Sequence, residues 1–210
     1  MALRIPFVVL FALAPLAVQA QAPVTGDAAR GKSLAYTCNG CHAVANYKNV
    51  YPTYSVPKLH GQRPEYLVAA LKAYKSGERS HGTMHSQASS MSEQDMADAA
   101  VYLAGPEVLT ASKNDVPAAG RPKASEVCLA CHGTNGVGIT ADYPTLSGQH
   151  RDYLERALRD YQKGGRKNPV MAGMVATLTP EDIAQLAAYY ARQTPALQTV
   201  PKKTSFLSSN

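Results

Sequence analysis

Apolar residues recur three and four positions apart in several segments of the chain, which is the spacing of amphipathic helices. One such segment starts at Pro64, ends at Gly77, and carries apolar side chains at positions 67, 70, 71 and 74. Its counterpart runs from Arg151 to Lys163 and is followed by two glycines. Proline in the first turn and glycine after the last turn are typical helix ends. Both segments are predicted to be helices.

A second pair of segments opens with helix-capping patterns. Ser92-x-x-Asp95 and Thr179-Pro180-Glu181-Asp182 both fit a capping box. Each pattern leads into an apolar stripe, made by Met96, Ala99, Ala100 and Leu103 in one segment and by Ile183, Leu186, Ala187 and Tyr190 in the other. Asp27 can cap a further helix that runs into Cys38. No strand-like alternation of any length is present, so the predicted fold class is all-α.

These helices belong to two copies of one unit. The run Pro57-Lys58-Leu59-His60-Gly61-Gln62 recurs 87 residues later as Pro144-Thr145-Leu146-Ser147-Gly148-Gln149, and the same offset relates Tyr66 to Tyr153 and Arg79 to Arg166. A repeat of this length indicates two domains of one fold. We predict a first domain over residues 21–106, a linker over 107–122, a second domain over 123–200 and a flexible tail over 201–210, with fraying from Pro195 onward.

Residues 1–20 have the composition of a secretory signal. Arg4 precedes an apolar stretch over residues 6–16, and Val18-Gln19-Ala20 fits the small-x-small cleavage rule. We expect cleavage after Ala20 and export to the periplasm, with an uncleaved N-terminal anchor as the alternative. No other segment is apolar enough to predict a transmembrane helix.

All four cysteines lie in two Cys-x-x-Cys-His motifs. The first motif contains Cys38, Cys41 and His42, and the second contains Cys128, Cys131 and His132. This spacing is the attachment signature of c-type haem, in which two thiols bind the haem vinyl groups and the histidine becomes an axial iron ligand. Two copies predict two covalently attached haem c groups. A redox dithiol, a disulfide or half of a zinc site would be the alternative for a single copy.

A methionine in each copy is the candidate for the second axial ligand. Met84 lies seven residues before Met91, and Met171 lies seven before Leu178 at the matching position. A thioether ligand raises the reduction potential and leaves no open position on the iron. Met174 competes with Met171, and core packing is the ordinary role of methionine. In the first copy, His81 and His85 are alternatives to Met84.

Together these motifs resemble the cytochrome c4 family, a family of periplasmic dihaem electron carriers that typically deliver electrons to terminal oxidases. The resemblance covers essentially the whole mature chain and implies two tandem class I cytochrome c domains. It implies His42 and Met84 on the first iron and His132 and Met171 on the second. It further implies that the carbonyls of Pro57 and Pro144 support the proximal histidines; Leu59 and Leu146 are expected to pack against the haems. The first copy departs from the family pattern at Ala43, at Met91 and in the loop over residues 46–51.

We therefore expect a non-enzymatic electron carrier whose partners are a respiratory donor complex and a terminal oxidase. Two rivals stay open: a dihaem enzyme such as a peroxidase or a thiosulfate-oxidising cytochrome, which would need a displaceable ligand on one iron, and a dedicated electron-accepting subunit of a dehydrogenase. A broad exposed apolar patch would favour the subunit over a free carrier.

Charge is distributed unevenly between the two halves. Loss of Arg4 with the signal lowers the formal net charge from +6 to +5. Residues 21–115 hold 9 basic and 8 acidic residues, a net +1, and residues 116–210 hold 11 and 7, a net +4. A solvated basic surface is the ordinary explanation. The functional alternative is a face that steers the second domain toward an acidic partner or, by peripheral association, an anionic membrane. It would be formed by Arg151, Arg156, Arg159, Lys163, Arg166 and Lys167. Nucleic acid is not an expected partner of an exported chain without a basic cluster.

Overall fold

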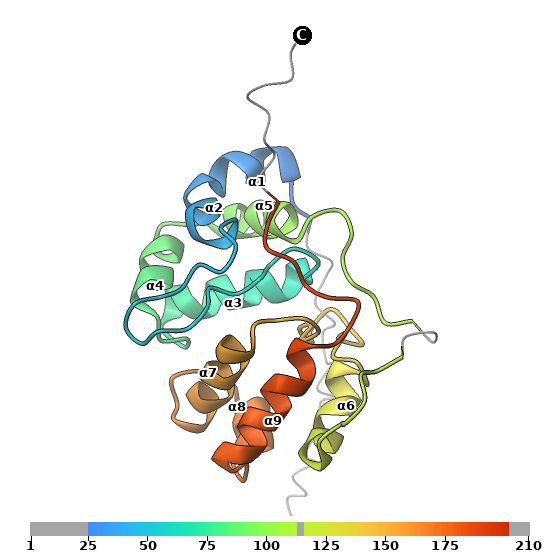
Figure 1. Ribbon diagram of the computed structural model, residues 1–210. Helices are drawn as coiled ribbons and strands as arrows, with labels where there is room; N and C mark the ends of the chain where they lie inside the picture. Colours follow the sequence, from blue (N-terminus) through green and yellow to red (C-terminus); the bar gives the residue numbers. More distant parts are fainter. Residues whose placement is uncertain (1–24, 113–115, 202–210) are drawn as a thin grey trace, which may run out of the picture.

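The computed structural model describes residues 25–112 and 116–201, and helices joined by loops make up that part of the chain (Figure 1). The predicted export signal over residues 1–20 lies outside the described residues. Apart from three isolated β-bridges, the described residues form no strand pairing. The helices are α1 (Ala28–Leu34), α2 (Tyr36–His42), α3 (Pro64–Ser76), α4 (Gly82–Ser89), α5 (Glu93–Ala104), η1 (Lys123–Ser125), α6 (Glu126–His132), α7 (Arg151–Gln162), α8 (Pro169–Val175) and α9 (Pro180–Ala191).

The first domain packs α1 and α3 against α5. The carboxylate of Asp27 caps α1 by accepting the backbone N–H of Ala29 at 2.7 Å. Gly31 allows α1 to approach α5 closely, because a Cβ at this position would lie 2.0 Å from the carbonyl oxygen of Asp98. Arg30 on α1 forms an ion pair with the carboxylate of Asp98. The core below these helices is formed by Ala35, Ala43, Leu67, Ala100, Leu103, Ala104 and Val200.

The second domain repeats this arrangement with α7 packed against α9. Its core consists of Leu154, Leu186, Ala187, Tyr189 and Tyr190. Both predicted capping boxes are present, since the side chains of Ser92 and Thr179 accept the N–H of Asp95 and Asp182, and those carboxylates accept in return. Gly77 ends α3 in a left-handed conformation, at φ 79°. The sequence therefore located the ends of these helices correctly.

Two short helices were not expected from the sequence. Met84 lies within α4 and Met171 within α8, two segments for which the sequence pattern predicted no helix. The helix after Asp27 also ends at Leu34, and the first Cys-x-x-Cys-His motif has its own helix, α2. Helices this short show too few turns to produce a readable apolar period.

The two domains meet through hydrogen bonds that follow the internal repeat. The side-chain amide of Gln62 donates to the carbonyl of Thr145 and accepts its N–H, both at 2.9 Å. Gln149 does the same to the backbone of Lys58, at 3.0 Å in both directions. Gln62 corresponds to Gln149 in the repeat, and Lys58 corresponds to Thr145. The interface is therefore locally two-fold symmetric, and both glutamines are buried within it.

A second symmetric contact lies at Arg79 and Arg166, which face each other as an isolated antiparallel bridge. On either side of this bridge, Ser80 donates its N–H to the carbonyl of Gly165, and Lys167 donates to the carbonyl of Glu78, both at 2.8 Å. These backbone bonds fix the start of each methionine-bearing segment against the other domain.

The chain after α9 returns to the first domain instead of fraying beyond Pro195 as the sequence predicted (Figure 1). Leu197 is fully buried and donates its N–H to the carbonyl of Ser147 at 2.9 Å. Gln198 pairs with His60 through two backbone hydrogen bonds of 3.0 Å. Val200 enters the core of the first domain, and its N–H donates to the carbonyl of His42 at 3.1 Å. We call residues 197–200 the C-terminal strap.

Candidate functional site

The first Cys-x-x-Cys-His motif opens onto a large pocket. Helix α2 places Cys38, Cys41 and His42 along one wall of a cavity of about 720 Å³. Met84 from α4 and Leu59 from the loop between α2 and α3 also line this cavity. The structure thus brings together every residue that the sequence predicted around the first haem, and both thiols are free of disulfide bonds.

The proximal histidines have the hydrogen bonds that the proline carbonyls were expected to accept. Nδ1 of His42 lies 2.9 Å from the carbonyl oxygen of Pro57, and Nδ1 of His132 lies 2.9 Å from that of Pro144. A carbonyl oxygen can only accept, so Nδ1 carries the proton and Nε2 keeps its lone pair. Burial lowers the pKa of both histidines, outweighing the opposing effect of the carbonyl, and so favours this neutral form. Each ring is therefore prepared as a metal ligand.

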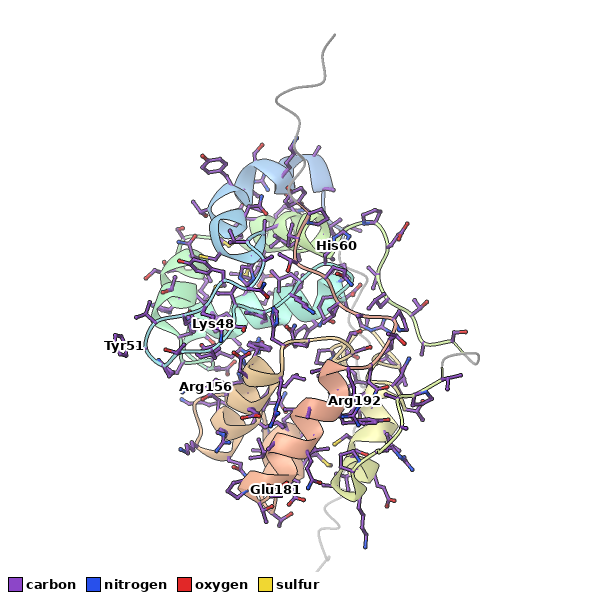
Figure 2. All side chains as sticks on the ribbon, viewed as in Figure 1. Lys48, Tyr51, His60, Arg156, Glu181 and Arg192 are labelled. Atoms are coloured by element: carbon purple, nitrogen blue, oxygen red, sulfur yellow. The ribbon has the colours of Figure 1, made fainter. Side chains whose placement is uncertain are left out.

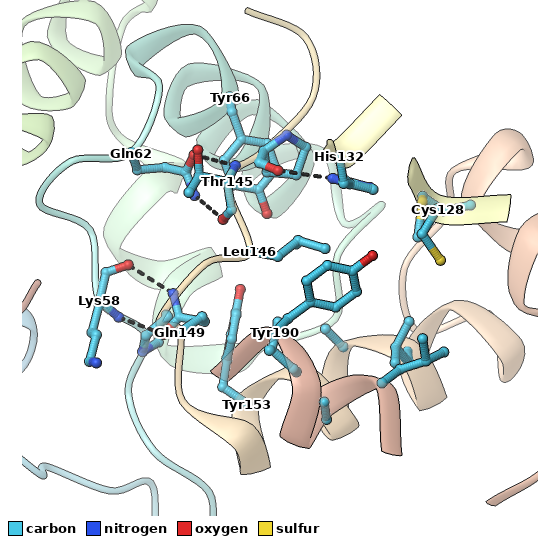
Figure 3. Close-up of a pocket in the computed structure, with 18 of the residues that line it drawn as sticks. Lys58, Gln62, Tyr66, Cys128, His132, Thr145, Leu146, Gln149, Tyr153 and Tyr190 are labelled. Atoms are coloured by element: carbon cyan, nitrogen blue, oxygen red, sulfur yellow. Dashed lines mark hydrogen bonds between the residues drawn. The ribbon is translucent and has the colours of Figure 1, made fainter. Parts of the chain in front are cut away.

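The second motif is arranged in the same way on α6 (Figure 3). Its pocket is lined by Cys128, His132, Leu146 and Met171. With about 90 Å³ of open space it is narrower than the first, and Figure 3 shows the ring of Tyr190 lying between Leu146 and Cys128. A haem would have to displace side chains such as Tyr190 to occupy this pocket. Cys131 lies on the same helix, beside Tyr143.

Each methionine is held by a capping residue three positions before it. In the second domain the side chain of Asn168 accepts the N–H of Met171 at 2.9 Å. In the first domain His81 occupies the equivalent position, and its Nδ1 accepts the N–H of Met84 at 3.2 Å. His81 thus replaces the asparagine as the N-cap of the helix.

The remaining contacts of His81 and His85 explain their presence in the first domain. Nε2 of His81 lies 3.3 Å from the side-chain oxygen of Asn49, so both ring nitrogens have protein partners. His85 is exposed, and its Nδ1 lies 2.8 Å from the carbonyl of Tyr74. Both histidine rings are engaged by the protein around Met84. Met174, the competitor in the second domain, is 46% exposed and does not line the pocket.

Two buried arginines were matched by the repeat, but the sequence indicated no role for Arg79 and placed Arg166 on the basic face of the second domain. Arg79 lines the first pocket and Arg166 the second, with only 6% and 7% of their surface exposed. They donate to the hydroxyls of Tyr66 and Tyr153 at 3.1 and 3.2 Å. The signal in the sequence was their recurrence at the common offset of 87, close to the methionines predicted as ligands.

Arg79 indicates what kind of group the first pocket accepts. Within the described residues Arg79 forms no ion pair with a carboxylate, and its Nε has no hydrogen-bond partner. A buried guanidinium without an anionic partner is costly. A haem carries two carboxylates beside its apolar ring, so it matches both the apolar walls and the unpaired charge. The residues present therefore fit a covalently attached haem.

The prediction of a basic face on the second domain is wrong for Arg166 and Arg156. Arg166 is buried at the domain interface, as described above. Arg156 is paired with Asp160 at 2.8 Å and turned toward the ring of Tyr54 in the first domain. Arg151 and Arg159 both lie near the carboxylate of Glu155, at 2.9 and 3.7 Å, which reduces the positive charge that they contribute to this face.

No helix in the described part of the chain is long and apolar enough to cross a membrane.

Comparison with known families matches each domain separately. The model described as "Cytochrome c" matches residues 28–105. The model described as "Cytochrome C oxidase, cbb3-type, subunit III" matches residues 115–189. Each matched range contains one Cys-x-x-Cys-His motif.

Relatives match across both domains. Cytochrome c4 of Pseudomonas aeruginosa is 32% identical over 191 residues, covering 84% of this chain and 94% of the relative. A protein of Stutzerimonas stutzeri described as a thiosulfate dehydrogenase electron acceptor is 28% identical over 202 residues, covering 84% and 89%. The crystal structure of reduced recombinant cytochrome c4 from Pseudomonas stutzeri superposes with a TM-score of 0.63 at 27% identity, covering 80% of this chain and all of that one.

Proposed function

Since this chain belongs to the cytochrome c4 family and is a dihaem electron carrier, we propose that it works in the periplasm and passes electrons from a respiratory donor complex to a terminal oxidase. Two haem c groups are attached covalently, one to Cys38 and Cys41 and one to Cys128 and Cys131. Bound haem supplies a one-electron couple between ferric and ferrous iron. The protein is a carrier and not an enzyme, as its cytochrome c4 relatives are.

The axial ligands that we propose are His42 with Met84 on the first iron and His132 with Met171 on the second. One observation carries this proposal: in both domains a buried histidine with its Nδ1 bound to a proline carbonyl shares a pocket with a methionine. Asn168 and His81 hold the backbone of the two methionines in the same way. Because both ring nitrogens of His81 have protein partners, and because His85 is exposed and does not line the pocket, we favour Met84 over either histidine.

The residues around each pocket do three things for electron transfer. The carbonyls of Pro57 and Pro144 keep the proximal imidazoles neutral and oriented. Thioether ligands raise the reduction potential and leave no open position for oxygen. Leu59 and Leu146 present apolar surface that excludes water from the ring faces. Fixed ligands keep the structural change between oxidation states small.

A stopped-flow experiment tests the proposed partner. The reduced dihaem protein is mixed with a purified terminal oxidase in the presence of oxygen, and oxidation is followed by absorbance. Two electrons should leave each molecule at a rate that increases with oxidase concentration. Failure of the oxidase to accept electrons, with both haems intact, would contradict the assignment of the acceptor.

A second candidate is the electron-accepting partner of a thiosulfate dehydrogenase. It rests on the full-length similarity to the Stutzerimonas stutzeri protein of that description. The same instrument separates the two functions: the oxidised protein is mixed with thiosulfate and a purified thiosulfate dehydrogenase. Reduction of both haems would support this second function, and an unchanged spectrum would exclude it for that enzyme.

A further inference from the structure

We propose that Arg156 and Asp160, which lie on α7 of the second domain, act across the domain boundary and set the reduction potential of the first haem. This inference needs two covalent haems, but it does not depend on the proposed axial ligands or on the redox partner. It concerns two positions at which the second domain differs from the first, although the two domains are copies of one unit.

The repeat shows that this pair is an addition to one domain only. Arg156 and Asp160 correspond to Ala69 and Ala73 on α3, by the offset of 87 residues. Helices α3 and α7 are equivalent, and both lie at the domain interface. The second domain therefore has an ion pair at the interface where the first domain has two alanine methyl groups. The charged groups around the two haem sites differ as a result.

The arginine of this pair points at the first haem site. Arg156 is one of the residues lining the first pocket, although it belongs to the second domain. Its guanidinium carbon lies 5.8 Å from the centre of the Tyr54 ring, and that ring packs edge-on against His81 with centroids 6.3 Å apart. Arg156 lies near the middle of α7, and it lines the first pocket together with Lys48 of the first domain (Figure 2).

The aspartate holds this arginine in place but lies outside the pocket lining. Nε of Arg156 lies 2.8 Å from Oδ1 of Asp160, and Asp160 is only 14% exposed. Its other oxygen lies 3.9 Å from Nε of Arg166. Asp160 is thus shared between two guanidinium groups, and the positive end of the Arg156–Asp160 pair is the end nearer to the first haem.

Electrostatics fixes the sign of the effect. A positive charge near the iron favours the ferrous state, because that state carries one less positive charge. Removing the charge of Arg156 should lower the potential of the first haem, and it also leaves Asp160 less compensated. Removing the charge of Asp160 should raise the same potential. Because Arg156 is 38% exposed, solvent and salt weaken the interaction without abolishing it.

A purely structural pair would behave differently. If Arg156 and Asp160 only joined the domains, Arg156→Gln and Asp160→Asn would both loosen the interface and shift the potential in the same direction. Opposite shifts are the signature of a charge effect. Arg156→Lys keeps the charge and should retain most of the wild-type potential. Arg156→Ala combined with Asp160→Ala recreates the first-domain pattern and should lower the potential by less than Arg156→Gln does, because the opposing charge of Asp160 is lost as well.

The test is a potentiometric titration of the holoprotein, with NMR contacts from the His42 or His132 ring to haem-methyl protons assigning each wave. Arg156→Gln should lower the first-haem midpoint more than the second, and Asp160→Asn should raise it. Arg159→Gln is the matched control, since Arg159 lies on the same helix with a similar 42% exposure and does not line the first pocket. Shifts of the same sign in Arg156→Gln and Asp160→Asn, no shift in either, or an equal shift in the control would overturn the proposal.

Discussion

The C-terminal strap should stabilise the first domain although it follows the last helix of the second. Val200 is 3% exposed and packs in the first core with Ala43, Leu67 and Leu103. Val200→Ala removes two buried carbon groups worth about 0.8 kcal/mol each and leaves a small cavity, for a total of about 2 kcal/mol. In a chain of this size that loss lowers the melting temperature by roughly 4 to 8 °C.

Thermal unfolding of the holoprotein, followed by circular dichroism in the Soret band, measures this effect. Val116→Ala is the control, because Val116 is 81% exposed in the linker and its truncation should leave the melting temperature unchanged. The signal of the first haem should change at the lower temperature in Val200→Ala. A wild-type melting curve for this variant, or a loss confined to the second haem, would refute the packing of the strap against the first core.

Three further predictions follow from single contacts. His81→Asn should keep the far-red absorption band that marks sulfur ligation, because asparagine caps the equivalent helix at Asn168; loss of the band would contradict capping as the role of His81. Gln62→Ala leaves the backbone N–H and carbonyl of Thr145 without their partner and should cost about 1–3 kcal/mol in denaturant unfolding, a loss that Gln62→Glu should not fully rescue since a carboxylate cannot donate to the carbonyl. Hydrogen bonds from Ser92, with further help from Arg30, lower the pKa of Asp95 to about 2, so the ionised carboxylate stabilises the folded state above its unfolded pKa of about 3.9. The stability difference between the wild type and Asp95→Asn should therefore be constant at neutral pH and disappear as the pH falls from about 4 toward 2; a difference that persists below that range would show that the charge is not its source.

Local sequence signals were sufficient for much of the fold. Helix ends at Gly77, Ser92 and Thr179 were predictable because a capping residue acts within one turn of its own helix. The internal repeat then placed equivalent helices in two domains. Helices α4 and α8 were missed because each has only two turns and an N-cap, His81 or Asn168, without a flanking apolar stripe.

Contacts between distant segments could not be derived in this way. Nothing in the strap sequence indicates that Val200 meets His42, since the contact depends on the path of the whole chain. Gln62 and Gln149 were matched by the repeat, but their partners lie in the opposite domain. The same holds at the site. The cysteines and proximal histidines follow from a local motif, whereas Arg79 indicates an anionic group in the pocket only because the structure buries it without a carboxylate partner.

Magnetic circular dichroism of the oxidised protein, recorded for the wild type and for Met84→Ala and Met171→Ala, tests whether histidine and methionine hold both irons. We expect two low-spin haems, a sulfur-to-iron band in the far red, and loss of part of that band in each single variant. The double variant should lose all of it. A band that survives Met84→Ala unchanged, or a high-spin haem in the wild type, would contradict a carrier in which both irons are held by histidine and methionine.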